Sequence, residues 1–131
     1  MKEVTKLLIN DFKVRQLNCD FMGYSLQKGD SMTFHHLLIP NRENGPYAYW
    51  NGVILFTTPH QYLHVIESID YHKFALIASE MQDMKVKGYL DDFNLQNIGA
   101  ILSEFEDKNK GRYTRKGRVL IKDSYLHRKY H

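Results

Sequence analysis

Four of the seven histidines fall between residues 35 and 64, in a pattern that could bind a metal ion. His35 and His36 are adjacent, and His60 and His64 follow with a spacing of four. Residues four apart lie on the same face of a helix, so the imidazoles of His60 and His64 can meet one ion. Two histidines leave such an ion short of ligands, and a third ligand must come from elsewhere in the chain.

His35 and His36 would divide two tasks between them on a strand. Adjacent side chains of a strand point to opposite faces, so only one of the two can reach the ion held by the helical pair. The other imidazole, with an ordinary pKa of about 6.5, can accept a proton from water when a backbone carbonyl holds its second nitrogen. Three protein ligands with one open position are typical of a catalytic metal site.

The spacing of these residues resembles that of the HNH, or His-Me finger, nucleases. From His36, Asn51 follows after 15 residues, His60 after 24 and His64 after 28. These intervals are most similar to those of the nuclease domains of DNase colicins, and phage-type HNH proteins are also similar. The likeness covers about 30 residues and rests on three segments, which are residues 35–40, 51–55 and 60–64.

The resemblance implies a fold, a site and an activity. It implies a ββα-metal core over about residues 31–68, with His35, His60 and His64 binding one divalent metal ion. His36 would be the general base, and Asn51 would bond across the loop between the strands to hold that base in place. The implied reaction is metal-dependent hydrolysis of phosphodiester bonds in nucleic acid, leaving 5′-phosphate and 3′-hydroxyl ends. DNA is favoured over RNA as the substrate.

The chain also departs from the family pattern. Many HNH proteins carry two Cys-x-x-Cys pairs around the motif, whereas Phe56 and Pro59 stand where one pair would lie, so no structural zinc is expected. Gly52 replaces the usual leucine after the asparagine, and Thr33 and Phe34 stand where an acidic partner would precede the histidines. None of these changes removes a proposed ligand or the base. An all-imidazole ligand set suits zinc or nickel, while manganese and magnesium stay open.

Turn formers and apolar runs predict an α+β fold around these residues. Residues 21–26 and 31–37 are expected to form an N-terminal hairpin, and the turn formers of residues 40–46 predict a surface loop. A second apolar strand is expected over residues 53–56, and the loop is expected to bring the two strands back together. Thr58 and Pro59 then predict the start of the helix that carries His60 and His64, with Thr58 as N-cap and Pro59 in the first helical position.

Two further helices are predicted as scaffold over residues 70–107. Asp70 is the expected N-cap of the first, and Gly88 its expected end. Asp91 or Asp92 opens the second. Apolar residues recur at helical spacing in both, which is typical of a buried core rather than of a ligand site. They are Phe74, Ile77, Ala78 and Met81 in the first, and Leu95, Ile98, Ile101, Leu102 and Phe105 in the second.

Charge is distributed unevenly along the 131 residues. Residues 1–107 hold 9 Lys/Arg and 14 Asp/Glu, whereas residues 108–131 hold 9 Lys/Arg and one acid. Such a basic extension can contact phosphates and release their counterions, which gives affinity that does not depend on base sequence. The candidate nucleic-acid contacts are Arg112, Arg115, Lys116, Arg118 and Lys122. The alternative is a solvated tail.

Composition limits the remaining possibilities. The single cysteine, Cys19, excludes an intrachain disulfide, and the N-terminal apolar run is too short for a signal peptide or a membrane span. We therefore expect a cytoplasmic protein with no membrane partner, one domain over residues 1–107 and a basic extension over residues 108–131. The predicted function is an HNH endonuclease, encoded by a phage or belonging to another mobile or defence element. The alternatives are a non-catalytic nucleic-acid-binding protein or an interaction protein that reuses the fold.

Overall fold

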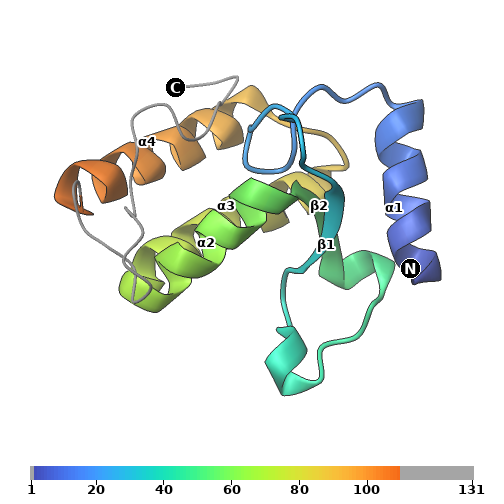
Figure 1. Cartoon of the computed structure of the whole chain (residues 1–131), viewed down its shortest axis with the longest axis horizontal. Helices are drawn as coiled ribbons and strands as arrows, with labels where there is room; N and C mark the ends of the chain where they lie inside the picture. The colour runs from blue at the N-terminus through green and yellow to red at the C-terminus, as the bar shows by residue number, and fades with distance from the viewer. Residues whose placement is uncertain (1, 110–131) are drawn as a thin grey trace.

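The computed structural model describes residues 2–109 and has an α+β architecture. In the described residues a two-stranded antiparallel sheet lies between one helix on one side and three helices on the other (Figure 1). The α+β class predicted from the sequence is confirmed. The elements are α1 (Glu3–Val14), β1 (Met32–His36), the 3-10 turns Asn41–Glu43 and Tyr49–Asn51, β2 (Gly52–Phe56), α2 (Thr57–Ile69), α3 (Tyr71–Lys87) and α4 (Asp92–Asn109).

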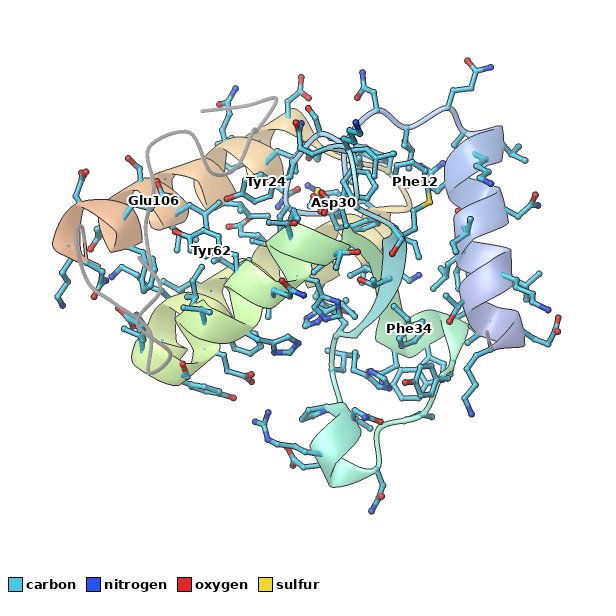
Figure 2. The ribbon with its side chains drawn as sticks, viewed as in Figure 1. Phe12, Tyr24, Asp30, Phe34, Tyr62 and Glu106 are labelled. Atoms are coloured by element: carbon cyan, nitrogen blue, oxygen red, sulfur yellow. The ribbon has the colours of Figure 1, made fainter. Side chains whose placement is uncertain are left out.

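The register of the sheet separates two apolar clusters. Phe34 of β1 pairs with Ile54 of β2, and both contribute to a cluster with Leu8 and Phe12 of α1. Side chains of the opposite face belong to a larger cluster that includes α2, α3 and α4. Figure 2 shows Phe12 on α1 and Phe34 on the strand within this smaller cluster. The helix α1 was not predicted, although its buried Leu8 and Phe12 have the four-residue spacing of a helix face.

The predicted N-terminal hairpin is wrong. Residues 21–26 form no strand beyond an isolated bridge at Tyr24, and β1 pairs instead with β2. The segment is held by Asp20, whose buried carboxylate accepts hydrogen bonds from the backbone amides of Met22 and Tyr24 and, at 3.1 Å, of Phe56. Because these carboxylate bonds turn the chain into the core, the alternating pattern of the segment does not produce a paired strand.

The helix α2 begins two residues earlier than predicted. Thr57 is its first residue, Phe56 takes the N-cap position, and Pro59 is third rather than first. The free amide of Thr58 is satisfied from a distance, because Asp30 accepts hydrogen bonds from both the amide and the hydroxyl of Thr58, at 3.2 and 2.6 Å. A carboxylate 28 residues away therefore does the work expected of the threonine hydroxyl.

The predicted start and end of α3 and the predicted start of α4 are confirmed. Asp70 caps α3 by accepting from the amide of Lys73, and Gly88 ends it with a φ of +84°. Asp91 accepts from the amide of Phe93 at the start of α4. Buried apolar residues of α3 and α4 pack with α2, and Tyr62 of α2 donates a 3.0 Å hydrogen bond to Glu106 of α4 (Figure 2).

The helix α4 continues to Asn109, two residues past the predicted boundary at residue 107. Within residues 2–109, no helix is both long and apolar enough to cross a lipid bilayer. The predicted phosphate contacts Arg112, Arg115, Lys116, Arg118 and Lys122 lie outside the described residues.

Candidate metal centre

Three of the four clustered histidines converge between β1 and α2. One ring nitrogen of each of His35, His60 and His64 lies within 4.8 Å of the others. The ring centroid of His35 lies 5.1 Å from the ring centroid of His60 and 5.8 Å from that of His64. The spacing of four along α2 puts His60 and His64 on one face, and the alternation of β1 turns His35 toward that face. The predicted ligand set is thus brought together by two elements.

The distances within the cluster fit a small cation. His35 Nδ1 and His60 Nε2 are 3.3 Å apart. Two nitrogens bound at the usual zinc distance of about 2.0–2.1 Å with a tetrahedral angle are separated by about 3.3–3.4 Å. In addition, the buried Nε2 atom of His35 has no hydrogen-bond partner among the described residues. The separation of His35 Nδ1 and His60 Nε2 fits a site that a divalent ion would complete. Because one imidazole binds an ion through a single nitrogen, the unpartnered Nε2 of His35 is a separate feature of the cluster.

The orientation of His60 follows from a hydrogen-bond chain. The hydroxyl of Thr33 donates to the backbone carbonyl of Leu55 at 2.6 Å, and the same oxygen lies 2.7 Å from His60 Nδ1. Because the hydroxyl proton is used on the carbonyl, Nδ1 of His60 is the donor to Thr33. The lone pair of a neutral His60 is therefore on Nε2, the nitrogen that faces His35.

His64 is oriented by a carboxylate. Its Nδ1 lies 3.1 Å from Oε1 of Glu67, and the other oxygen of Glu67 accepts from Arg42 at 3.1 Å. Carboxylates in this position fix the ring and strengthen the imidazole as a ligand. Sequence reasoning missed Thr33 and Glu67 as partners of the ligands. Glu67 could have been found from its place three residues after His64 on the same helix face.

Burial keeps two of the ligands neutral. Burial, together with the neighbouring imidazoles, lowers the pKa of His35 well below its ordinary value and lowers that of His60 to about 4. Both rings therefore carry free lone pairs near neutral pH. Protonation of either would place a positive charge among the other rings, whereas a shared cation held by the lone pairs relieves that conflict.

His36 lies on the opposite face of β1, as predicted for the neighbour of a ligand. Its ring packs against Phe34 and Tyr47, with centroid distances of 4.9 and 4.5 Å. Burial lowers its pKa, and a hydrogen bond to the backbone carbonyl of Gly45 partly opposes that shift. The Nε2 atom is buried and has no partner among residues 2–109, so it retains an unshared site for a proton.

The Asn51 side chain holds the loop between the two strands through hydrogen bonds of both its oxygen and its amide group. Its side-chain oxygen accepts from the amides of Leu38 and Ile39, each at 2.9 Å. Its amide donates to the carbonyls of Ile39 and Pro46, at 2.9 and 3.0 Å. All of the side chain's hydrogen-bonding capacity is thereby used, in a fully buried position. The loop that carries Gly45 against His36 is held in one shape by this residue.

Two glycines allow close packing around His36. A Cβ on Gly52 would lie 2.1 Å from the ring of Phe34, so this ring occupies the space that a leucine after the asparagine would need. A Cβ on Gly45 would lie 1.9 Å from the carbonyl oxygen of Ile39. The departure at Gly52 is therefore matched by the phenylalanine on β1.

The comparisons with known proteins add no family to this geometry. The chain matches no family model, no curated protein and no solved structure. The chemistry of the site therefore rests on the residues themselves. Three imidazoles can hold one divalent ion, and a fourth on the neighbouring strand position can exchange a proton.

Proposed function

We propose that the protein is a metal-dependent endonuclease of the HNH kind, which hydrolyses phosphodiester bonds in nucleic acid and favours DNA over RNA. The observation that carries the proposal is that two adjacent histidines of β1 face opposite sides of the strand. His35 faces His60 and His64, whereas His36 faces the loop and is held by the Gly45 carbonyl. A structural metal site requires the first arrangement and gives no role to the second.

The three-histidine cluster would bind one divalent ion, either zinc, nickel, manganese or magnesium. Such an ion supplies a positive charge for the phosphate oxygens and for the leaving oxygen as negative charge develops there. His35, His60 and His64 fix its place, and Thr33 and Glu67 fix the rings of the last two. The order β1, β2, α2 that carries these residues is compatible with a ββα-metal core.

His36 would act as the general base. With the Gly45 carbonyl holding one ring nitrogen, Nε2 can accept a proton from the attacking water. That atom is covered in the described structure, and the ring of Tyr47 lies against the imidazole. Substrate must therefore displace part of this cover, and the loop fastened by Asn51 keeps the imidazole aligned while it does so.

The basic extension would supply affinity for the phosphate backbone. The described residues hold more acidic than basic side chains, and residues 108–131 carry the compensating positive charge. The proposed contacts are the five residues Arg112, Arg115, Lys116, Arg118 and Lys122, and cytoplasmic nucleic acid, from a phage or its host, is the proposed target. A non-catalytic nucleic-acid-binding protein would share these contacts and would lack cleavage.

The deciding experiment is cleavage of supercoiled plasmid by the full chain. Nicked and linear products should form with a divalent metal and disappear with EDTA. His36→Ala should reduce the rate by about 10²- to 10⁴-fold, which is the usual contribution of a general base, while zinc still binds. His72→Ala is the matched control, because His72 is exposed and lies outside the cluster. Cleavage by His36→Ala at the rate of the control would contradict the proposal.

A further inference from the structure

A second recess opens on the α1 side of the sheet, away from the three-histidine cluster. About 460 Å³ of space, part of it open solvent, lies between α1, β2 and the end of α3. Its walls are mostly apolar, and they include Leu8, Phe12, Ile54 and Met84. We call it the α1 pocket. No role in the proposed metal site explains it, because none of the three ligands lines it.

One side of the α1 pocket combines an aromatic ring with a lysine. The ammonium of Lys85 lies 3.8 Å from the ring centroid of Tyr49, and both residues line the pocket. Lys85 is partly buried and makes no ion pair with any of the described residues within 4 Å. Asp11 lies near enough to interact electrostatically with Lys85, although the two form no ion pair within 4 Å. A partly buried cation with no carboxylate in direct contact, beside an exposed aromatic ring, is suited to an anion that carries a flat ring.

The rim of the pocket offers both donors and acceptors. Asp11 and Arg15 line the rim, where Arg15 Nη1 lies 3.6 Å from Asp11 Oδ2. Arg15 also donates to the backbone carbonyl of Gly88, another residue that lines the pocket. A nucleobase has flat apolar faces and an edge with donors and acceptors. The apolar walls and the Tyr49 ring match the flat faces, and this mixed rim matches the edge.

The pocket lies beside His36 on the same face of the sheet. Phe34 pairs with Ile54, and His36 pairs with Gly52, so Ile54 and His36 are diagonal neighbours on that face. Such neighbours lie roughly 7–8 Å apart. The chain links the two places as well, because Tyr47 contacts the His36 ring and Tyr49 forms a wall of the pocket.

We infer that the α1 pocket holds one unpaired base of the nucleic-acid substrate, with a phosphate of that nucleotide on Lys85. A base stacked and paired within a duplex cannot enter a recess of this kind, so the substrate is single-stranded, or has a base turned out of the helix, next to the bond that is cut. This inference rests on the proposed nuclease function for the link to cleavage. The pocket itself can be tested without cleavage.

The test is binding of 2′-deoxyadenosine 5′-monophosphate to the metal-free full chain, followed by heteronuclear NMR. We expect saturable shifts at amides that line the α1 pocket, such as Ile54, Lys85 and Gly88, and much weaker shifts with inorganic phosphate. Tyr49→Ala should weaken binding by about fivefold or more, the loss typical of one base-stacking contact. Tyr71→Ala, at an exposed tyrosine outside the pocket, should leave it unchanged.

A charge control separates the pocket from general attraction. Lys85→Gln should weaken nucleotide binding by at least as much as Tyr49→Ala, whereas Lys13→Gln removes the same charge from an exposed part of α1 and should have little effect. Equal affinity in the two lysine variants, or equal binding of inorganic phosphate, would overturn the inference. Plasmid cleavage without nucleotide binding would refute the pocket alone, and nucleotide binding without any cleavage would refute the proposed function alone.

Discussion

The β1–β2–α2 region and the α3–α4 pair satisfy their polar groups to different degrees. In the helical pair, Lys73 pairs with Asp70 and Glu104 at 3.4 and 3.3 Å, and Lys87 pairs with Asp83 and Asp91. In the strand region, by contrast, the buried Nε2 atoms of His35 and His36 have no partner among the described residues.

This contrast identifies the region whose buried polar atoms are open to a ligand. Asp30 and Gln82 each have one further buried atom without a partner in the described residues, whereas the His35 ring lies beside the rings of His60 and His64. A buried polar group without a partner costs free energy, and such groups persist where a ligand or a reaction uses them. The α3–α4 pair pairs its charged groups, whereas the strand region leaves buried polar atoms available for the proposed metal and the proposed base.

Removing a ligand should have the largest effect on this contrast. His60→Ala leaves two imidazoles for the ion, so we expect zinc binding and metal-dependent cleavage to be lost together. Isothermal titration calorimetry with zinc and the plasmid assay measure the two effects. His72→Ala is again the control, since it removes an exposed imidazole from α3. Zinc affinity that is equal in both variants would mean that the ion binds elsewhere.

Removing a partner of a ligand should have a smaller effect. Glu67→Gln keeps the size of the side chain but weakens its hold on His64 Nδ1, and we expect zinc affinity to fall by about 10- to 100-fold. Glu104→Gln makes the same change in the α3–α4 pair, where Glu104 is an exposed partner of Lys73, and should leave zinc affinity unchanged. If both variants bind zinc as the wild type does, the carboxylate does not support the site.

The candidate ligands could be predicted from the sequence because their positions depend on local periodicity. Spacings of four on a helix and one on a strand assign the faces of His60, His64, His35 and His36 without knowledge of the rest of the fold. Asn51 could be predicted for a similar reason, since the family resemblance fixes its interval from the pair.

The features that sequence reasoning missed depend on contacts between distant segments. Thr33 reaches His60 across 27 residues, and Asp30 caps α2 from 28 residues away. The false hairpin at residues 21–26 arose because alternation indicates a strand but not its partner, and here the Asp20 carboxylate holds that segment against the core instead. The predicted return of the chain from the first strand to the second through the loop of residues 40–46 is confirmed by the antiparallel pairing of β1 with β2.

Acid should affect the two regions in different pH windows. Burial lowers the pKa of His35 and His60 in the folded protein, so their stabilising contribution is complete above the unfolded value of about 6.5 and is lost as pH falls toward 4. Hydrogen bonds from the backbone of Lys73 lower the pKa of Asp70, and that contribution is lost only below about 4.

Urea unfolding of the EDTA-treated protein at pH 7.5, 6 and 5 measures this difference. The free energy of unfolding should fall over that range, with a limiting slope of about 1.4 kcal/mol per pH unit for each extra proton bound on unfolding. His60→Gln should flatten the decline. A free energy of unfolding that stays constant from pH 7.5 to 5 would contradict the neutral, buried state of the cluster.

The smallest effect on the site should come from the core of the helical pair. Ile98 is fully buried in α4, and Ile98→Val removes one methylene from that core, so the free energy of unfolding should fall by about 0.5–1.5 kcal/mol. Zinc affinity, measured well below the unfolding transition, should stay within about twofold of the wild type, because independent sites contribute additively. A larger loss of zinc affinity would mean that α4 positions α2 as well as stabilising the fold.

The contact to examine would then be the hydrogen bond from Tyr62 to Glu106, which joins α4 to the helix that carries two of the three ligands. Tyr62→Phe would remove that hydrogen bond without opening a cavity. A drop in zinc affinity in this variant too would show that α4 helps to position His60 and His64 through its contact with α2.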